Sequence, residues 1–149
     1  MLNRSRDVFS SLHRHEVRYV VIGGIAVVLH GVPRATFDLD ILIDANMDNA
    51  RRLLAALEEA GLGTAVMITA AELLANEVTI FNDRVRIDVQ TKTPGLDFDT
   101  AWSRRVVMTV QSQEFYVVAL EDLLASKRAA GRPKDLEDLR LLEAHLPRV

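Results

Sequence analysis

Apolar and polar residues follow each other along the chain in two periods, one typical of strands and one typical of helices. Residues 17–22 form an apolar run that predicts a buried strand, and residues 24–30 form an apolar stretch that predicts a short helix, ended by Gly31 and Pro33. The other expected elements are helices over 4–15, 47–60, 120–130 and 133–145, strands over 37–43, 78–81, 84–90, 106–110 and 115–118, and a short helix opened by a capping box of Thr69 and Glu72. No repeat or long linker interrupts this order, so we expect one domain over residues 1–149.

Two aspartates interrupt the apolar pattern of the strand at 37–43. Side chains alternate across a strand, so Asp38 and Asp40 point to the same face, roughly 7 Å apart along the backbone. The opposite face carries the apolar residues Phe37, Leu39, Ile41 and Ile43. The same alternation in the strand at 84–90 places Asp88 on one face with Arg86. If the two strands are neighbours in one sheet, three carboxylates converge, and their mutual repulsion is costly unless cations neutralise it.

These aspartates also have an explanation without function, in which Asp38 and Asp40 lie on a solvated sheet face and Asp88 pairs with Arg86. The glycine pair at 23 and 24 bears on this choice. A tight turn from a strand into a helix leaves backbone N–H groups free to bind phosphate, and glycine lacks the Cβ that would block a close approach. The plain explanation of the pair is a packing turn. Phosphate donors beside ligands for a hard cation are, however, what a nucleoside triphosphate with Mg²⁺ requires.

Composition narrows the class of protein. The chain has 149 residues, of which 49% are apolar, enough for one core of ordinary size. It has no cysteine, which excludes disulfides and thiolate metal sites and favours an intracellular setting. No apolar run is long enough to span a membrane, and residues 1–10 are charged where a signal peptide would be apolar, so we expect a cytoplasmic protein without membrane contact. The formal net charge of -3 argues against a dedicated nucleic-acid coat.

Taken together, these residues resemble the active-site pattern of the nucleotidyltransferases related to DNA polymerase β. The pattern consists of Gly23-Gly24, then thirteen residues, then Asp38-Leu39-Asp40-Ile41, with a later strand aspartate in Arg86-Ile87-Asp88-Val89. The resemblance extends to the AbiEii-type branch, found as toxins in bacterial toxin-antitoxin and phage-defence loci, through His30-Gly31, Arg34-x-Thr36, Lys127 and Gly131-Arg132-x-Lys134-Asp135-x-x-Asp138. It covers residues 17–142. Many relatives have Gly-Ser in place of Gly23-Gly24, so here backbone N–H groups must bind phosphate without a serine hydroxyl.

The resemblance implies an α+β protein with the minimal nucleotidyltransferase fold, a mixed β-sheet flanked by helices with further helices at the C-terminus. It implies a magnesium-dependent enzyme that moves a nucleoside monophosphate from an NTP to an acceptor hydroxyl, as the toxin of a pair with an antitoxin protein as partner. The implied catalytic residues, which are also the ligands of Mg²⁺ or Mn²⁺, are Asp38, Asp40 and Asp88. The implied nucleotide-binding residues are Gly23, Gly24, Arg34, Thr36 and Lys127. For the arginine and the lysine, a solvated side chain is the alternative.

The acceptor and the activity stay open at this stage. The acceptor could be RNA, a protein or a small molecule. Basic residues concentrate in the second half of the chain, and C-terminal helices that flank the carboxylates would form a positive rim suited to RNA, whereas a solvated basic helix pair is the alternative. The residues of this rim are Arg84, Arg86, Arg104, Arg105, Lys127, Arg128, Arg132 and Lys134. A non-catalytic nucleotide-binding module that acts with a partner protein is the alternative function. Asp135 and Asp138, at the start of the last helix, are explained by the helix dipole, and any further role stays open.

Overall fold

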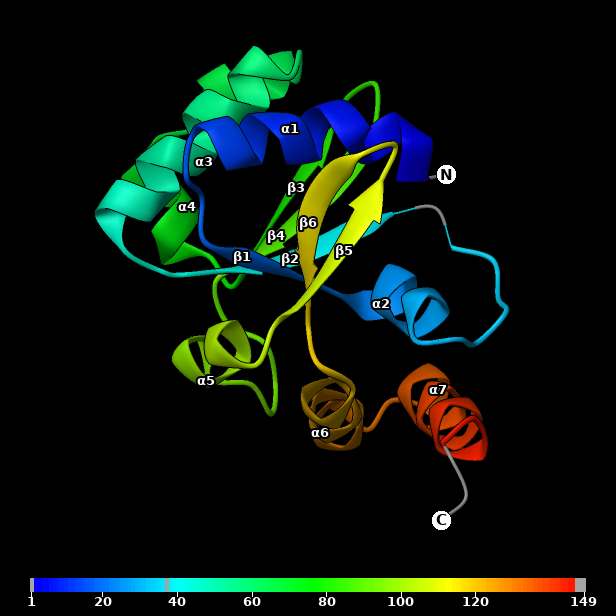
Figure 1. The fold of residues 1–149 in the computed structure, drawn as a ribbon. Coiled ribbons are helices and arrows are strands. Elements are labelled where there is room, and N and C mark those ends of the chain that lie inside the picture. Colours follow the sequence, from blue (N-terminus) through cyan, green and yellow to red (C-terminus); the bar gives the residue numbers. More distant parts are fainter. Residues whose placement is uncertain (1, 37, 147–149) are drawn as a thin grey trace.

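The computed structural model describes residues 2–36 and 38–146, which form a sheet with helices on both sides (Figure 1). The strands are β1 (Tyr19–Ile22), β2 (Leu39–Ile43), β3 (Val78–Asn82), β4 (Arg86–Gln90), β5 (Val106–Val110) and β6 (Gln113–Val117). The α-helices are α1 (Arg6–Arg14), α2 (Gly23–Leu29), α3 (Met47–Glu59), α4 (Ala70–Ala75), α5 (Phe98–Ser103), α6 (Leu120–Ala130) and α7 (Pro133–Ala144), and the 3-10 helices are η1 (Leu2–Ser5) and η2 (Gly63–Met67).

The sheet has six strands in the order β3-β4-β2-β1-β6-β5 and is mixed. Strand β1 pairs antiparallel with β2 and parallel with β6, while β2 pairs parallel with β4. The two outer pairs, β3 with β4 and β5 with β6, are antiparallel, as the sequence predicts. The predicted α+β class with a mixed sheet is therefore confirmed. Phe37, predicted to open the strand that contains β2, lies outside the described residues.

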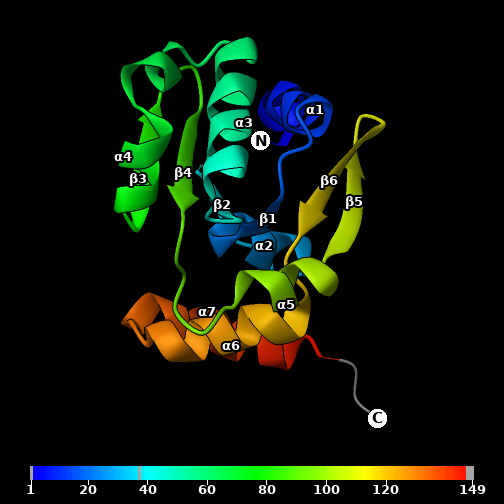
Figure 2. The ribbon, with the colours of Figure 1, turned by 90° about the vertical axis from the view of Figure 1, so that its left-hand side faces the viewer.

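Helices lie on two sides of the sheet. Helices α1 and α3 cover one side, and α5, α6 and α7 gather on the other, with α2 near the sheet (Figures 1 and 2). On the first side, Phe9 of α1 stacks on Phe115 of β6 with ring centroids 4.5 Å apart. Buried residues of α1, α3 and the strands belong to one hydrophobic cluster, because the apolar faces of these elements meet there.

Local signals in the sequence explain several helix starts. The capping box of α4 is present, since Thr69 Oγ1 accepts a hydrogen bond from the Glu72 backbone N–H at 3.1 Å. Pro133 opens α7 as predicted. Helix α5 is not among the expected elements, although Asp97 accepts from the Thr100 N–H at 3.1 Å and so caps it. Within residues 2–36 and 38–146, no helix combines the length and the apolar character needed to cross a lipid bilayer.

Candidate active site

The three predicted carboxylates meet on one face of the sheet, as the strand alternation requires. Strands β2 and β4 are parallel neighbours, and their register places Asp40 opposite Asp88. The residues that follow them, Ile41 and Val89, are fully buried on the opposite face. Asp38 precedes β2 and remains 44% exposed, whereas Asp88 is 16% exposed. The structure thus brings Asp38, Asp40 and Asp88 together, because the two strands are neighbours, which the sequence pattern alone leaves as a condition.

Burial and the repulsion between carboxylates both act on Asp40 in this cluster. The pKa of Asp40 is raised from 3.8 to about 7 by burial, by the charges of Asp88 and Asp38, and by a hydrogen bond with Asp88. The charge of Lys134 acts in the opposite direction but is too weak to cancel these effects. A carboxyl whose pKa is raised by neighbouring carboxylates is a site where added positive charge is favourable.

Arg86, which lies on β4 with Asp88, occupies part of the carboxylate cluster. Arg86 Nε lies 3.0 Å from Asp88 Oδ1 and 3.7 Å from Asp38 Oδ2, and Arg86 Nη2 lies 3.3 Å from Asp88 Oδ2. The ion pair between Arg86 and Asp88, which the sequence offers as an alternative to convergence, therefore coexists with it. Within the described part of the chain, no group of three His, Asp or Glu side chains forms a ready-made metal site. The donors fit a hard cation in kind, but Arg86 must first turn away from them.

The glycine pair lies directly against the cluster. Gly23 has a φ of +70°, and a Cβ built there would be 2.2 Å from Asp40 Oδ2. A Cβ at Gly24 would be 2.7 Å from Thr36 Oγ1 and 3.5 Å from Arg34 Nη2. Since real Cβ atoms do not approach another heavy atom within 3.0 Å, a Cβ at position 23 or 24 would force Asp40 or Thr36 to shift. Four of the five predicted nucleotide-binding residues are therefore close together, around the start of α2.

The fifth predicted nucleotide-binding residue, Lys127 of α6, is held in a buried ionic cluster with α7. Lys127 Nζ lies 3.3 Å from Asp135 Oδ1 and 3.0 Å from Asp138 Oδ2, and its side chain is only 8% exposed. Asp138 also pairs with Arg34, and Arg132 Nε lies 2.6 Å from Asp135 Oδ2. Burial acts to raise the pKa of Asp135, but the hydrogen bond from Arg132 and the charge of Lys127 lower it overall. A solvated lysine, the alternative to a phosphate contact, does not fit this burial.

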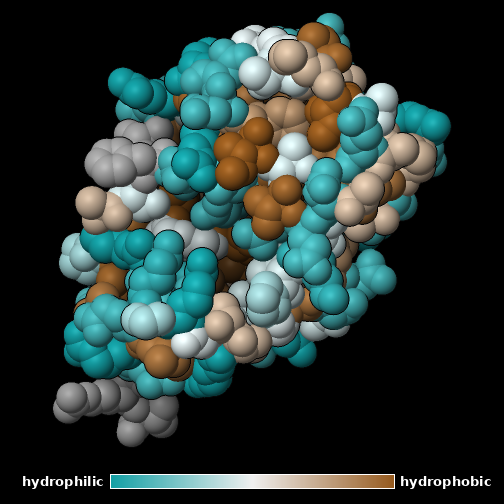
Figure 3. Space-filling model, turned by 180° about the vertical axis from the view of Figure 1, so that it is seen from behind, coloured by the Kyte–Doolittle hydropathy of each residue, from teal (hydrophilic) through white to brown (hydrophobic). Residues whose placement is uncertain are grey.

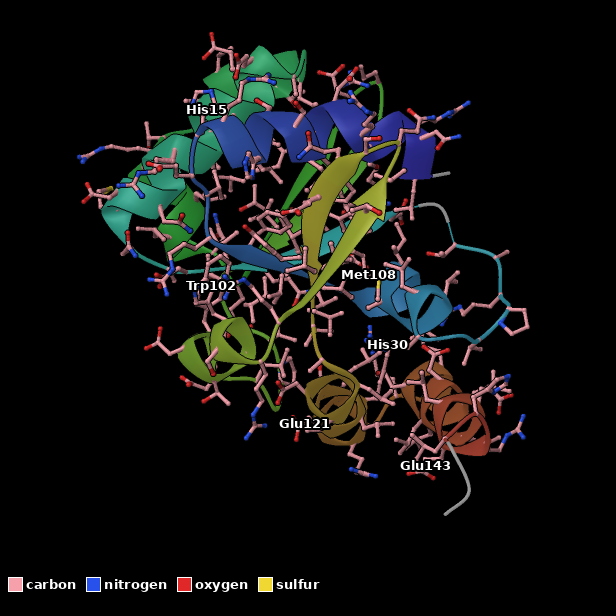
Figure 4. All side chains as sticks on the ribbon, viewed as in Figure 1. His15, His30, Trp102, Met108, Glu121 and Glu143 are labelled. Carbon is pink, nitrogen blue, oxygen red and sulfur yellow. The ribbon has the colours of Figure 1, made fainter. Side chains whose placement is uncertain are left out.

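The roles of Asp135 and Asp138 go beyond the helix dipole that the sequence suggests. Asp135 does cap α7, because it accepts from the Arg132 backbone N–H at 3.2 Å. Both aspartates are also almost fully buried, at 1% and 3% exposure, as counter-ions of Lys127. Sequence reasoning missed this because nothing in the local pattern shows that α6 packs against α7 through charged side chains. His30, between α2 and the C-terminal helices (Figure 4), contacts the Val118 carbonyl oxygen through Nε2 at 2.8 Å.

Most of the predicted basic rim is paired with acidic residues. Arg104 Nη1 lies 3.1 Å from Asp122 Oδ1, and Arg128 Nη2 lies 3.0 Å from Glu143 Oε1. Lys127 and Arg132 belong to the buried ionic cluster. The charge of Lys134 acts to lower the pKa of Asp40. The C-terminal helices therefore carry less uncompensated positive charge than the sequence suggests.

Two hollows lie beside the residues of the site. The smaller, of about 350 Å³, lies between the strands and α6 and is lined by Gly23, Val78, Lys127 and Arg132 among others. The larger, of about 560 Å³, is lined by Asp38, Arg86 and neighbouring residues. From behind, the molecular surface is hollowed between the sheet and the C-terminal helices (Figure 3). Asp38 of the carboxylate cluster lines the larger hollow, and Gly23, which lies against Asp40, lines the smaller one.

A mixed sheet that carries an Asp-x-Asp strand beside a third strand aspartate defines the class of nucleotidyltransferase-like proteins. The chain matches the family model described as nucleotidyltransferase of unknown function, DUF6036, over residues 5–144, and it belongs to this family. Its fold resembles the crystal structure of a protein from Thermotoga maritima described as a candidate nucleotidyltransferase, with a TM-score of 0.59, 17% identity, and coverage of 97% of this chain and 93% of that one. No curated protein matches. The predicted general class is confirmed, and the match does not reach the narrower AbiEii-type branch.

Proposed function

We propose that this protein is a metal-dependent enzyme that moves a nucleoside monophosphate from an NTP to an acceptor hydroxyl. The observation that carries the proposal is the strand register that places Asp40 opposite Asp88, with Asp38 two residues earlier and Gly23 against Asp40. Three carboxylates on a rigid sheet can fix the geometry of a phosphoryl group, and positioning with charge stabilisation accounts for most of the catalysis of such transfers.

Asp38, Asp40 and Asp88 would hold Mg²⁺ or Mn²⁺, which are ions that prefer carboxylate oxygen ligands. A bound divalent cation would supply positive charge for the α-phosphate and the leaving pyrophosphate. The raised pKa of Asp40 supports this assignment, because burial and the neighbouring Asp88 and Asp38 charges disfavour its ionised form, which a bound cation would stabilise. Arg86, which pairs with Asp88 in the structure, would have to release it.

The chain's own residues would then perform the transfer. The acceptor hydroxyl oxygen bonds to the α-phosphorus while the bond between the α-phosphorus and the oxygen bridging to the β-phosphate breaks. Pyrophosphate leaves with the electron pair of that bond, and the hydroxyl proton passes to the Asp88 carboxylate. The triphosphate would be bound by residues around the smaller hollow and the glycine turn: Gly23, Gly24, Arg34, Thr36 and Lys127.

Transfer of label from α-³²P-labelled NTPs into a cell extract tests the proposal. The Asp40→Asn variant should lose at least about a thousand-fold in rate, because one oxygen ligand becomes a neutral amide. Asp48→Asn is the matched control, since Asp48 is 80% exposed on α3 and contacts only Arg51 among the described residues. Thermal unfolding with Mg²⁺ and each NTP measures binding separately, and about 2.7 kcal/mol of stabilisation is expected at a hundred times the dissociation constant. Equal transfer by wild type and Asp40→Asn contradicts the proposal.

A non-catalytic nucleotide-binding module that acts with a partner protein is the second candidate function. The observation in its favour is Arg86, whose guanidinium neutralises Asp88 and contacts Asp38 as a built-in cation. Such a module would be stabilised by NTP without transferring label to any acceptor. Label transfer under conditions in which NTP and Mg²⁺ stabilise the wild-type chain separates the two functions, because the enzyme transfers label there and a binding module does not.

The narrower assignment to AbiEii-type toxins also forms part of the proposal, together with a cytoplasmic location and an antitoxin partner. It is supported by three motif residues, since both Lys127 and Arg132 contact Asp135 in the structure. Induced expression in bacteria tests it. A toxin should arrest growth, Asp40→Asn should not, and co-expression of the neighbouring gene should relieve the arrest. Normal growth with the wild-type chain, at verified expression, contradicts the toxin role.

A further inference from the structure

The two hollows beside the carboxylate cluster differ in which predicted residues line them. Gly23 and Lys127, both assigned to the nucleotide, line the smaller hollow. Asp38 and Arg86 line the larger hollow, which contains no residue assigned to the nucleotide. If the proposed function is correct, the NTP enters through the smaller hollow. The acceptor must reach the α-phosphate from another direction, and the larger hollow provides it.

Positive charge gathers in the larger hollow. Arg4, Arg84 and Arg86 line it, together with two aspartates, Asp38 and Asp83. Arg84 is committed to the fold, because its Nη2 and Nε donate to the Ala60 carbonyl oxygen at 2.7 and 3.1 Å. Arg4 and Arg86 are the two other guanidinium groups that line the hollow.

Arg4 and Arg86 differ in whether they contact the carboxylate cluster. Arg4 is exposed, and its side chain makes no hydrogen bond or ion pair with residues 2–36 and 38–146. Arg86 pairs with Asp88 and is 41% exposed. A divalent cation at the carboxylates would replace this pairing and turn the Arg86 guanidinium toward the hollow. Guanidinium groups bind phosphate oxygens through paired, charge-assisted hydrogen bonds.

We propose that the larger hollow is the acceptor site, and that it takes an acceptor whose hydroxyl lies near a phosphate group bound by Arg4 and Arg86. The volume of about 560 Å³ is sufficient for a nucleotide-sized group. The same arginines disfavour polycationic acceptors such as aminoglycosides. The phosphate could belong to an RNA end or to a small phosphorylated molecule, which share this chemistry.

Fluorescence anisotropy of a 5′-fluorescein-labelled RNA pentanucleotide with a free 3′-hydroxyl tests the site. The full chain is first saturated with Mg²⁺ and a non-transferable α,β-methylene NTP, so that the nucleotide site is filled. Adenosine 5′-monophosphate and adenosine then compete with the probe. We expect the monophosphate to compete at least about ten-fold better than adenosine, because only the monophosphate can pair with the arginines. If the RNA binds far more tightly than the monophosphate, the acceptor is a polynucleotide. If the two bind with similar affinity, the acceptor is a small phosphorylated molecule. Both outcomes support the phosphate contact.

Arg4→Gln is the decisive variant, because Arg4 does not contact the carboxylates in the structure. It should weaken binding of the phosphorylated probes about ten-fold and raise the KM of the acceptor without changing the KM of the NTP. Arg51→Gln is the matched control, since Arg51 is 66% exposed on α3 and does not line the hollow. Equal binding by Arg4→Gln and Arg51→Gln overturns the proposal, as does stronger competition by an aminoglycoside. Failure of the wild type to be stabilised by NTP and Mg²⁺ instead contradicts the proposed function.

Discussion

Two charged clusters on either side of the glycine turn differ in how their charges are compensated. In the carboxylate cluster, Asp38 and Asp88 contact Arg86, and the third aspartate, Asp40, has a raised pKa. In the buried ionic cluster, Asp135 and Asp138 contact Lys127, Arg34 and Arg132, and the pKa of Asp135 is lowered. The first cluster therefore has an excess of negative charge, and the second has enough cations for each carboxylate.

This difference indicates different physical roles. Charges that are fully paired in the interior hold elements together, and loss of one partner leaves an uncompensated buried charge. Where charges are paired only in part, binding of a ligand with the opposite charge is favourable. The ionic cluster joins α6, α7 and the segment before β2, while the carboxylate cluster is ready to bind a cation. The two clusters should respond to mutation with opposite signs.

The largest effect is expected for Lys127→Met. This change removes the cation between Asp135 and Asp138 while keeping a long apolar side chain, and it should destabilise the protein by about 3 kcal/mol. Urea unfolding at pH 7.5 measures the loss. Arg128→Met is the control from the same helix, because Arg128 is 57% exposed and pairs with Glu143 at the surface, where a change within about 0.5 kcal/mol is expected. Equal stability of the two variants would mean that the buried ionic cluster does not hold the helices.

The next effect concerns the contact between the glycine turn and the carboxylate cluster. Gly23→Ala should destabilise the protein by roughly 2 to 3 kcal/mol, because φ is +70° and the new Cβ would meet Asp40 Oδ2. Gly31→Ala is the control, since Gly31 also has positive φ, at +104°, but open space around the built Cβ, so only about 1 kcal/mol is expected. An Asp40→Ala background should reduce the difference, because it removes the contacts with Oδ2 and Cγ and leaves only that with Cβ at 3.0 Å. If the difference persists there, the steric contact with Asp40 is not its cause.

Sequence reasoning predicted the parts of this site that depend on local alternation. The shared face of Asp38 and Asp40, the hairpin that carries Asp88 and the start of α7 at Pro133 each follow from a few neighbouring residues. That β2 and β4 are neighbours had to be assumed, because pairing of parallel strands depends on the whole chain. The sequence pattern does not predict α5, because a helix of six residues is too short to show a helical period of apolar positions.

The buried ionic cluster shows what local patterns cannot give. Arg34 and Asp138 are 104 residues apart in the chain, and their pairing results from packing of α7 beside the segment before β2. The helical pattern around Lys127 leaves a solvated lysine possible, and only tertiary packing buries it. Likewise, Arg86 could be assigned to the face of Asp88, but its reach to Asp38 depends on the strand register.

The smallest effect has the opposite sign and depends on pH. Asp40 has a folded-state pKa of about 7, above its ordinary value of 3.8, so its contribution to stability is present at low pH and is lost as pH rises through 7. Asp40→Asn cannot ionise and escapes this loss. The variant should match the wild type near pH 4 and become increasingly more stable than it between pH 4 and 7. Above pH 7 it should remain more stable by about 1 to 2 kcal/mol, a value reduced by the partial exposure of Asp40.

Urea unfolding across this pH range without divalent cations measures the difference in stability between Asp40→Asn and the wild type. Addition of Mg²⁺ at pH 8 should stabilise the wild type and not the variant, which would reverse their order. A constant difference at all pH values would show that Asp40 acts through packing or hydrogen bonding, and the contrast with the buried ionic cluster would then not rest on charge.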